Sequence, residues 1–161
     1  MAQGLFWGTH NLGAFQGLLL WSILRDRFDL VKYLLVKSRM SIPTSLAIAS
    51  ICETIKEKTA PDTDTKSDYK DYHNEYENYA VEIFSKLWDS SWESTEKILG
   101  WPQKEWANMT ALDFAEVANA HKFLALPGSA PIFLSLFINL IPEIKPMKPE
   151  VTSENFELVL F

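Results

Sequence analysis

The sequence predicts an all-α protein, a stack of helix-turn-helix units of ankyrin-like size with an irregular C-terminal tail. Three observations support this fold class. Apolar residues recur at spacings of three and four along much of the chain, which is the period of an amphipathic helix. Proline, glycine and capping residues separate these stretches where helices are expected to begin and end. With 161 residues, the chain is long enough to bury roughly 68 to 70% of its unfolded surface.

The first helical unit is expected over residues 17–58, after an N-terminal leader at 1–16. Residues 18–24 (LLLWSIL) are apolar on most sides of a helix, which predicts a position inside the stack rather than on its surface. A second helical pattern runs over residues 28–35. This pair of about 20 residues has the size of an ankyrin-like unit.

A third helix is expected to begin near Ser41, with Pro43 in the first turn, where its missing N–H costs nothing. Residues 59–68 then form an acidic linker, rich in small polar residues. The acids in and after this linker are expected to be solvated. They lack the glycine and terminal glutamate spacing of an EF-hand calcium loop. These acids are Asp62, Asp64, Asp68, Asp71, Glu75 and Glu77.

The second helical unit is expected over residues 69–140 and opens with tyrosines on one helix face. A tyrosine buries its ring while its hydroxyl reaches a polar rim. This property suits the edge of the chain's own core, which is the simpler interpretation. It also suits contact with a neighbouring subunit, which makes the tyrosines a candidate interaction surface. The residues concerned are Tyr69, Tyr72, Tyr76 and Tyr79.

Capping signals predict two further helices. Ser90 and Glu93 have the spacing of a capping box, and Gly100 is placed to end that helix in a left-handed conformation. Thr110 and Asp113 have the same spacing before the next helix, whose narrow face is expected to carry Leu112, Ala115 and Ala118. A last helix is expected over residues 132–140, before a tail at 141–161 in which three prolines forbid a regular helix.

Composition excludes several classes of protein. The net charge of −6 and a pI near 5.1 argue against a nucleic-acid surface, which needs clustered basic residues. The single cysteine, Cys52, rules out an intrachain disulfide framework. Two stretches without charge, 2–24 and 123–142, are candidates for membrane spans. Polar residues and glycines interrupt the first, and Pro127 to Pro131 break the second, so no span is expected.

Enzyme signatures are absent from the sequence. It contains no dinucleotide-binding glycine motif, Walker loop, H-E-x-x-H or G-x-S-x-G motif. The three histidines lie in separate segments, so no two of them are four residues apart on one helix, and Cys52 has apolar neighbours typical of an inert thiol. The sequence therefore predicts a protein that is not an enzyme and has no cofactor, metal site or catalytic residue.

Several motifs occur in a fixed order between residues 17 and 137, and together they resemble the cytosolic helical region that precedes the membrane in TRPM (melastatin-type) cation channels. The segment LLLW, ending at Trp21, resembles the family's L-L-I/L-W helix, and AIASIC, from Ala47 to Cys52, resembles its A-L-x-A-C helix. The segment EYENYAV from Glu75 resembles an E-Y-E-x-x-A-V/I motif. Trp106 and Thr110 to Ala115 resemble a W-x-x-x-T-C-L-x-L-A motif, with Ala111 in place of its cysteine.

The resemblance implies a cytosolic helical region of a calcium-permeable channel subunit, used for assembly with other TRPM-like subunits and for coupling to a pore that this chain lacks. The expected W-x-G-x-L entry to the membrane is missing after Phe137, so a fragment or short form of a channel is expected. The alternative is a stand-alone helical adaptor that regulates channel subunits. The family motifs assign structural roles to Trp21, Trp106, Thr110, Leu112 and Ala115, and the resemblance adds Phe133, Leu136 and Phe137 as a second candidate interaction surface.

Overall fold

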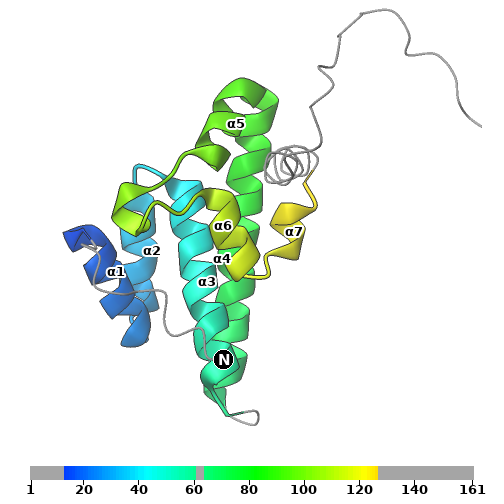
Figure 1. Cartoon of the computed structure of the whole chain (residues 1–161). Coiled ribbons are helices and arrows are strands. Elements are labelled where there is room, and N and C mark those ends of the chain that lie inside the picture. The colour runs from blue at the N-terminus through cyan, green and yellow to red at the C-terminus, as the bar shows by residue number, and fades with distance from the viewer. Residues whose placement is uncertain (1–12, 61–63, 127–161) are drawn as a thin grey trace, which may run out of the picture.

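The computed structural model describes residues 13–60 and 64–126, and it confirms the all-α class (Figure 1). Within these ranges no strand forms, although one isolated antiparallel bridge joins Gln103 to Met109. The ankyrin-like form of the stacking stays a prediction. The helices are α1 (Ala14–Leu24), α2 (Phe28–Lys37), α3 (Ser41–Lys58), α4 (Asp64–Ser90), α5 (Trp92–Gly100), the 3-10 turn η1 (Lys104–Trp106), α6 (Ala111–Val117) and α7 (His121–Leu124).

Helix α3 lies at the centre of the fold, beside the longer helix α4 (Figure 1). Every residue from Ile42 to Glu53 is buried, so this helix has no exposed face over three turns. It packs most extensively against α4, and α1, α2 and α6 cover its other sides. Residues of both predicted helical units, 17–58 and 69–140, contribute to the same hydrophobic cluster.

Helix α1 lies at the edge of the stack, and the prediction that it would be enclosed is wrong. Only Leu19, Ser22 and Ile23 are buried. On the opposite side, 44% of Leu18, 49% of Trp21 and 58% of Leu24 is exposed. The sequence is apolar around most of the helix, and the described residues cover only one side of it.

Two of the α-helices end on a left-handed residue that is not glycine. Asp26 has φ 56° after α1, and Asn119 has φ 52° after α6. At each site the next N–H bonds to a carbonyl five residues back, Arg27 to Ser22 and Ala120 to Ala115, at 2.9 Å in both cases. These bonds define Schellman motifs, in which aspartate and asparagine tolerate the conformation usually adopted by glycine.

The linker expected at 59–68 is shorter than predicted, because α4 already begins at Asp64. Of the acids expected to be solvated, Asp64, Asp68, Asp71 and Glu75 are exposed. Glu77 is the exception, since only 3% of it is exposed. Asp62 lies outside the described residues.

The first predicted capping box is wrong, whereas the second is confirmed. Ser90 is the last residue of α4, where its hydroxyl donates to the Leu87 carbonyl, and the α5 N-cap is Ser91. Gly100 stays within α5 and does not have positive φ. At α6 the full box forms: the Asp113 N–H donates to Thr110 Oγ1 at 3.2 Å, and the Thr110 N–H donates to Asp113 Oδ2 at 2.7 Å.

Several predicted features lie outside the described residues. These are most of the leader at 1–16, the helix at 132–140, the tail at 141–161, and the interaction candidates Phe133, Leu136 and Phe137.

The two helix starts give a matched prediction. Thr110→Ala should lower the free energy of unfolding by about 0.5 to 2 kcal/mol, because it removes the acceptor for the Asp113 N–H. Ser91→Ala should cost less than about 0.5 kcal/mol, because the Ser91 side chain makes no capping hydrogen bond to the α5 backbone. Urea denaturation of the two variants measures both values, and equal losses would contradict the assignment of these caps.

Candidate functional site

The tyrosines of α4 line the chain's own core, so they are not an exposed interaction surface. Only 4% of Tyr69 and 2% of Tyr76 is exposed, and Tyr72 and Tyr79 are half-buried against the same cluster. The ring of Phe28 stacks on Tyr72 and meets Tyr69 edge to face. The Tyr69 hydroxyl donates to Asp26 Oδ1 at 2.7 Å, and it also lies 3.1 Å from the Ile23 carbonyl. This residue therefore attaches the end of α1 to α4.

Exposed apolar side chains gather instead on the α1–α2 pair, which lies at one side of the molecule (Figure 1). Helix α1 contributes Leu18, Trp21 and Leu24, whose spacing of three puts them on one helix face, and no residue of α1 is charged. Helix α2 contributes Tyr33, 59% exposed, and Val36, 72% exposed. We call these five residues the α1–α2 exposed set. Sequence reasoning missed it because it placed α1 inside the stack.

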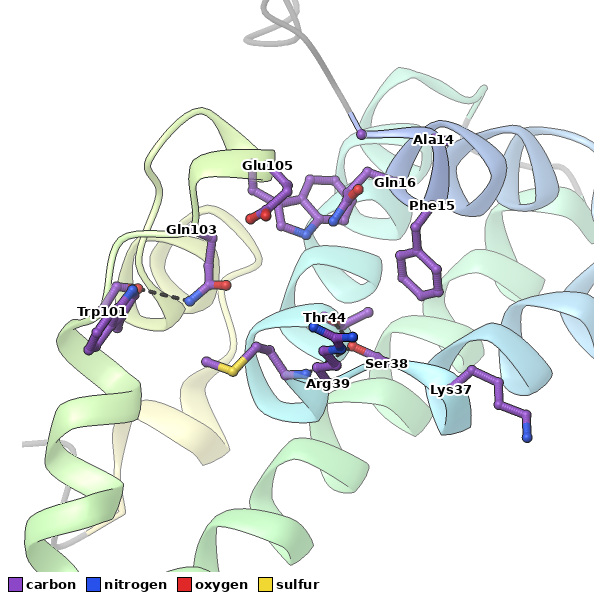
Figure 2. Close-up of a pocket in the computed structure, with 13 residues that line it drawn as sticks. Ala14, Phe15, Gln16, Lys37, Ser38, Arg39, Thr44, Trp101, Gln103 and Glu105 are labelled. Carbon is purple, nitrogen blue, oxygen red and sulfur yellow. Dashed lines mark hydrogen bonds between the residues drawn. The ribbon is translucent and has the colours of Figure 1, made fainter.

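A cavity of about 710 Å³ opens between the start of α1, the connection from α2 to α3, and the segment leading into η1 (Figure 2). Its walls carry both charged and aromatic side chains. Arg39 lines one side and Glu105 another. The aromatic residues of the lining are Phe15, Trp101 and Trp106. The lining residues extend from Gly13 to Trp106 in the sequence, so no local motif indicates this site.

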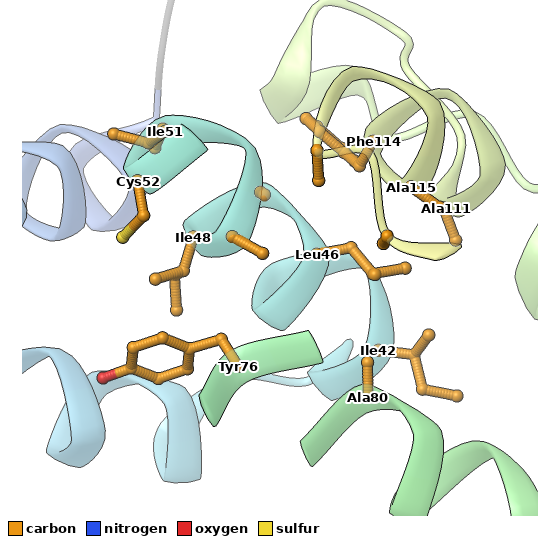
Figure 3. Close-up of a cluster of buried hydrophobic side chains, with 14 of the residues drawn as sticks. Ile42, Leu46, Ile48, Ile51, Cys52, Tyr76, Ala80, Ala111, Phe114 and Ala115 are labelled. Atoms are coloured by element: carbon orange, nitrogen blue, oxygen red, sulfur yellow. The ribbon is translucent and has the colours of Figure 1, made fainter. Parts of the chain in front are cut away.

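Three of the five residues assigned by the family motifs belong to the interior near α6. Trp106 is 3% exposed and its ring meets Phe114 edge to face. Leu112 and Ala115 are buried, and the small side chains of α6 face α3 in the core (Figure 3). Thr110 caps the same helix. Trp21 differs from these four, because half of it is exposed.

A buried polar cluster joins α3 and α4 to the turn between α6 and α7. His73 Nε2 lies 2.7 Å from the Ala118 carbonyl, so this nitrogen carries the proton and donates it. The carboxylate of Glu53 pairs with Lys56, and Asn119 donates to its other oxygen at 3.4 Å. Glu77 Oε1 accepts from the N–H of Lys122 at 2.7 Å. These contacts hold the turn and the start of α7 in place.

The described residues contain no group of three or more His, Cys, Asp or Glu side chains placed to hold a metal ion. Cys52 is fully buried, and burial is the main cause that raises the pKa of its thiol to about 12, with the nearby Glu53 charge adding to the effect. A thiol held in this protonated form is a poor nucleophile.

In the part of the chain that the structure describes, no helix combines the length and the apolar character that a membrane span requires. Compared with known protein families, residues 9–126 match the TRPM2-like domain. This range takes in every described helix and well over half of the chain. The match confirms the resemblance to TRPM-type channels that the motifs indicate.

Two tyrosines of α4 provide a matched test of the buried hydroxyls. Tyr69→Phe should lower the free energy of unfolding by about 1 to 3 kcal/mol, since it leaves the Ile23 and Asp26 acceptors without this donor. Tyr76→Phe should be neutral or stabilising, because the Tyr76 hydroxyl is buried without a hydrogen-bond partner among the described residues. Thermal denaturation compares them, and a larger loss for Tyr76→Phe would show that these hydroxyls have been misassigned.

Proposed function

Because the chain belongs to the TRPM2-like domain family, we propose that it acts as a cytosolic helical assembly region of a TRPM-like, calcium-permeable cation channel subunit. Its role is to connect cytosolic parts and other channel subunits at the cytoplasmic face of a membrane, and it has no enzymatic activity. The observation that carries this proposal is the α1–α2 exposed set: Leu18, Trp21, Leu24, Tyr33 and Val36.

An end unit of a helical stack normally has a polar outer face, because nothing covers it. Helix α1 does not follow this rule. It has no charged residue, and its outer face presents Leu18, Trp21 and Leu24. Such a face favours association, since burying it removes apolar surface from water. Tryptophan is also among the residues that most often dominate interface energetics.

The charge pattern of the chain agrees with an interface at α1–α2. The exposed acids described on α4, including Asp64, Asp68 and Asp71, belong to a different helix. A partner that approaches α1 meets no fixed charge between Ala14 and Leu24. The α1 part of the contact is therefore expected to depend on apolar burial and to weaken little as salt is raised, whereas α2 also carries the exposed charged residues Asp29, Lys32 and Lys37.

The proposal is tested by co-expression with a full-length TRPM-type subunit. The wild-type chain should co-purify with that subunit and change its current, whereas the chain alone should produce no current. The combined variant Trp21→Gln and Leu24→Lys should reduce co-purification by about tenfold or more, as expected when interface anchors are removed. Lysine suits position 24 because a cation is favourable at a helix C-terminus.

Val117→Lys is the matched control. Val117 is 52% exposed at the end of α6, so the variant changes a similarly exposed apolar residue in the last turn of another helix. This variant should bind like wild type, and thermal denaturation should confirm that all variants remain folded. If the wild-type chain binds no TRPM-type subunit, or if both variants weaken binding equally, the proposed role of α1–α2 is wrong.

A further inference from the structure

We propose that the cavity between α1, the α2–α3 connection and η1 binds a small zwitterionic molecule with an apolar body, of the class of aromatic α-amino acids. The proposal rests on residues other than those of the α1–α2 exposed set and does not depend on the channel role. The cavity volume of about 710 Å³ lies within the range of roughly 300 to 1,000 Å³ that is usual for small-molecule sites.

One wall of the cavity supplies a cation. Arg39 is exposed, lines the cavity, and makes no ion pair with the described residues. Figure 2 shows its side chain beside Ser38 and Thr44, whose hydroxyls lie 2.7 Å apart. Lys37 also lines the cavity, but its Nζ lies over the Tyr33 ring, 5.6 Å from the centroid. The Arg39 guanidinium is thus the group available to a carboxylate, which it can bind through two parallel hydrogen bonds.

Another wall supplies acceptors. Glu105 is exposed and, like Arg39, has no ion-pair partner in the described part of the chain. Its neighbour Gln103 is only 7% exposed, and its Nε2 donates to the Trp101 carbonyl at 3.0 Å. This bond turns the amide oxygen of Gln103 away from Trp101 (Figure 2). The Glu105 carboxylate and this amide oxygen can both accept hydrogen bonds from an ammonium group.

Apolar groups complete the lining. The Phe15 ring extends from α1 toward the α2–α3 connection (Figure 2), and Met40 lies on that connection. Trp101 is 64% exposed although it lines a cavity, so its indole offers a face on which a ligand ring can stack. A site with a mainly apolar lining and a few convergent polar groups is typical of small-molecule recognition.

The opposite charges of Arg39 and Glu105 favour a zwitterion over an ion of either sign. They belong to different walls and do not neutralise one another through an ion pair. A ligand with only a carboxylate could bind the Arg39 guanidinium but would leave the Glu105 carboxylate without a partner. A ligand with only an amine could bind Glu105 but would leave Arg39 without a partner. A molecule with both groups can offer its carboxylate to Arg39 and its ammonium group to Glu105, which is the charge complementarity that confers specificity.

Calorimetric titration of the full chain with three matched probes tests the proposal. L-Phenylalanine carries both charges, 3-phenylpropanoate only the carboxylate, and phenethylamine only the amine. L-Phenylalanine should bind saturably and at least about tenfold more tightly than either of the others, since each lacks one charged hydrogen-bonding group. The absence of saturable binding up to about 10 mM, a range that includes weak small-molecule affinities, would overturn the proposal, as would equal binding of all three probes.

Variants locate the site. Arg39→Gln and Glu105→Gln should each weaken L-phenylalanine binding by about tenfold. Lys86→Gln and Glu82→Gln remove the charges of an exposed ion pair on α4 and should leave binding unchanged. Arg39 and Glu105 are exposed, so their variants should retain the wild-type melting temperature. Unchanged binding in both cavity variants would place any bound amino acid elsewhere and contradict the proposed site.

Discussion

The complete burial of α3 from Ile42 to Glu53 is the constraint on which the rest of the structure depends. A helix with no exposed face needs neighbours on every side, and α1, α2, α4 and α6 provide them. Small side chains let the helices approach closely: Ala47 and Ala49 on α3, Ala80 on α4, and Ala111 and Ala115 on α6, all fully buried. Where helices pack this closely, adding even one methylene group to a core side chain is expected to change the free energy of unfolding. Figure 3 shows the larger side chains of α3, such as Leu46 and Ile48, filling the space between these contacts.

Burial of α3 also requires that its polar groups find partners inside the protein. Ser45 and Ser50 donate to carbonyls of their own helix, Ser50 to Ala47 at 2.8 Å. Glu53 cannot be satisfied in this way, and it pairs with Lys56 and Asn119. An unpaired buried carboxylate would cost several kcal/mol. The polar cluster around Glu53 therefore couples the central helix to the distant turn before α7.

Features that depend on neighbours in the sequence could be predicted, and Thr110 is the clearest case. Its capping box involves only Asp113, three residues away, so the spacing alone identifies it. The start of α3 near Ser41 was predicted for the same reason. Because Ser90 and Ser91 are adjacent, the sequence does not show which of them is the N-cap of α5. The left-handed helix ends at Asp26 and Asn119 could not be predicted, because glycine is the usual signal for that conformation.

Features that depend on distant contacts could not be predicted. Glu77 belongs to an acidic stretch and was expected to be solvated, but it is buried against the N–H of Lys122, 45 residues away. The prediction for α1 failed for the same reason. Periodicity shows that a helix is apolar, but it does not show which neighbours cover it. The cavity joins Arg39 to Glu105 from separate segments, so only the fold reveals it. The family could therefore be recognised from the sequence, whereas the two proposed binding surfaces could not.

Native-state hydrogen exchange of the isolated chain tests the central role of α3 most directly. If every described element depends on this helix, the amides from Ser45 to Glu53 should exchange only through global unfolding, and should be the slowest in the chain. The edge helix α1 should exchange faster, through local opening, because one side of it is exposed. Exchange of α3 at the rate of α1, or faster, would contradict the account.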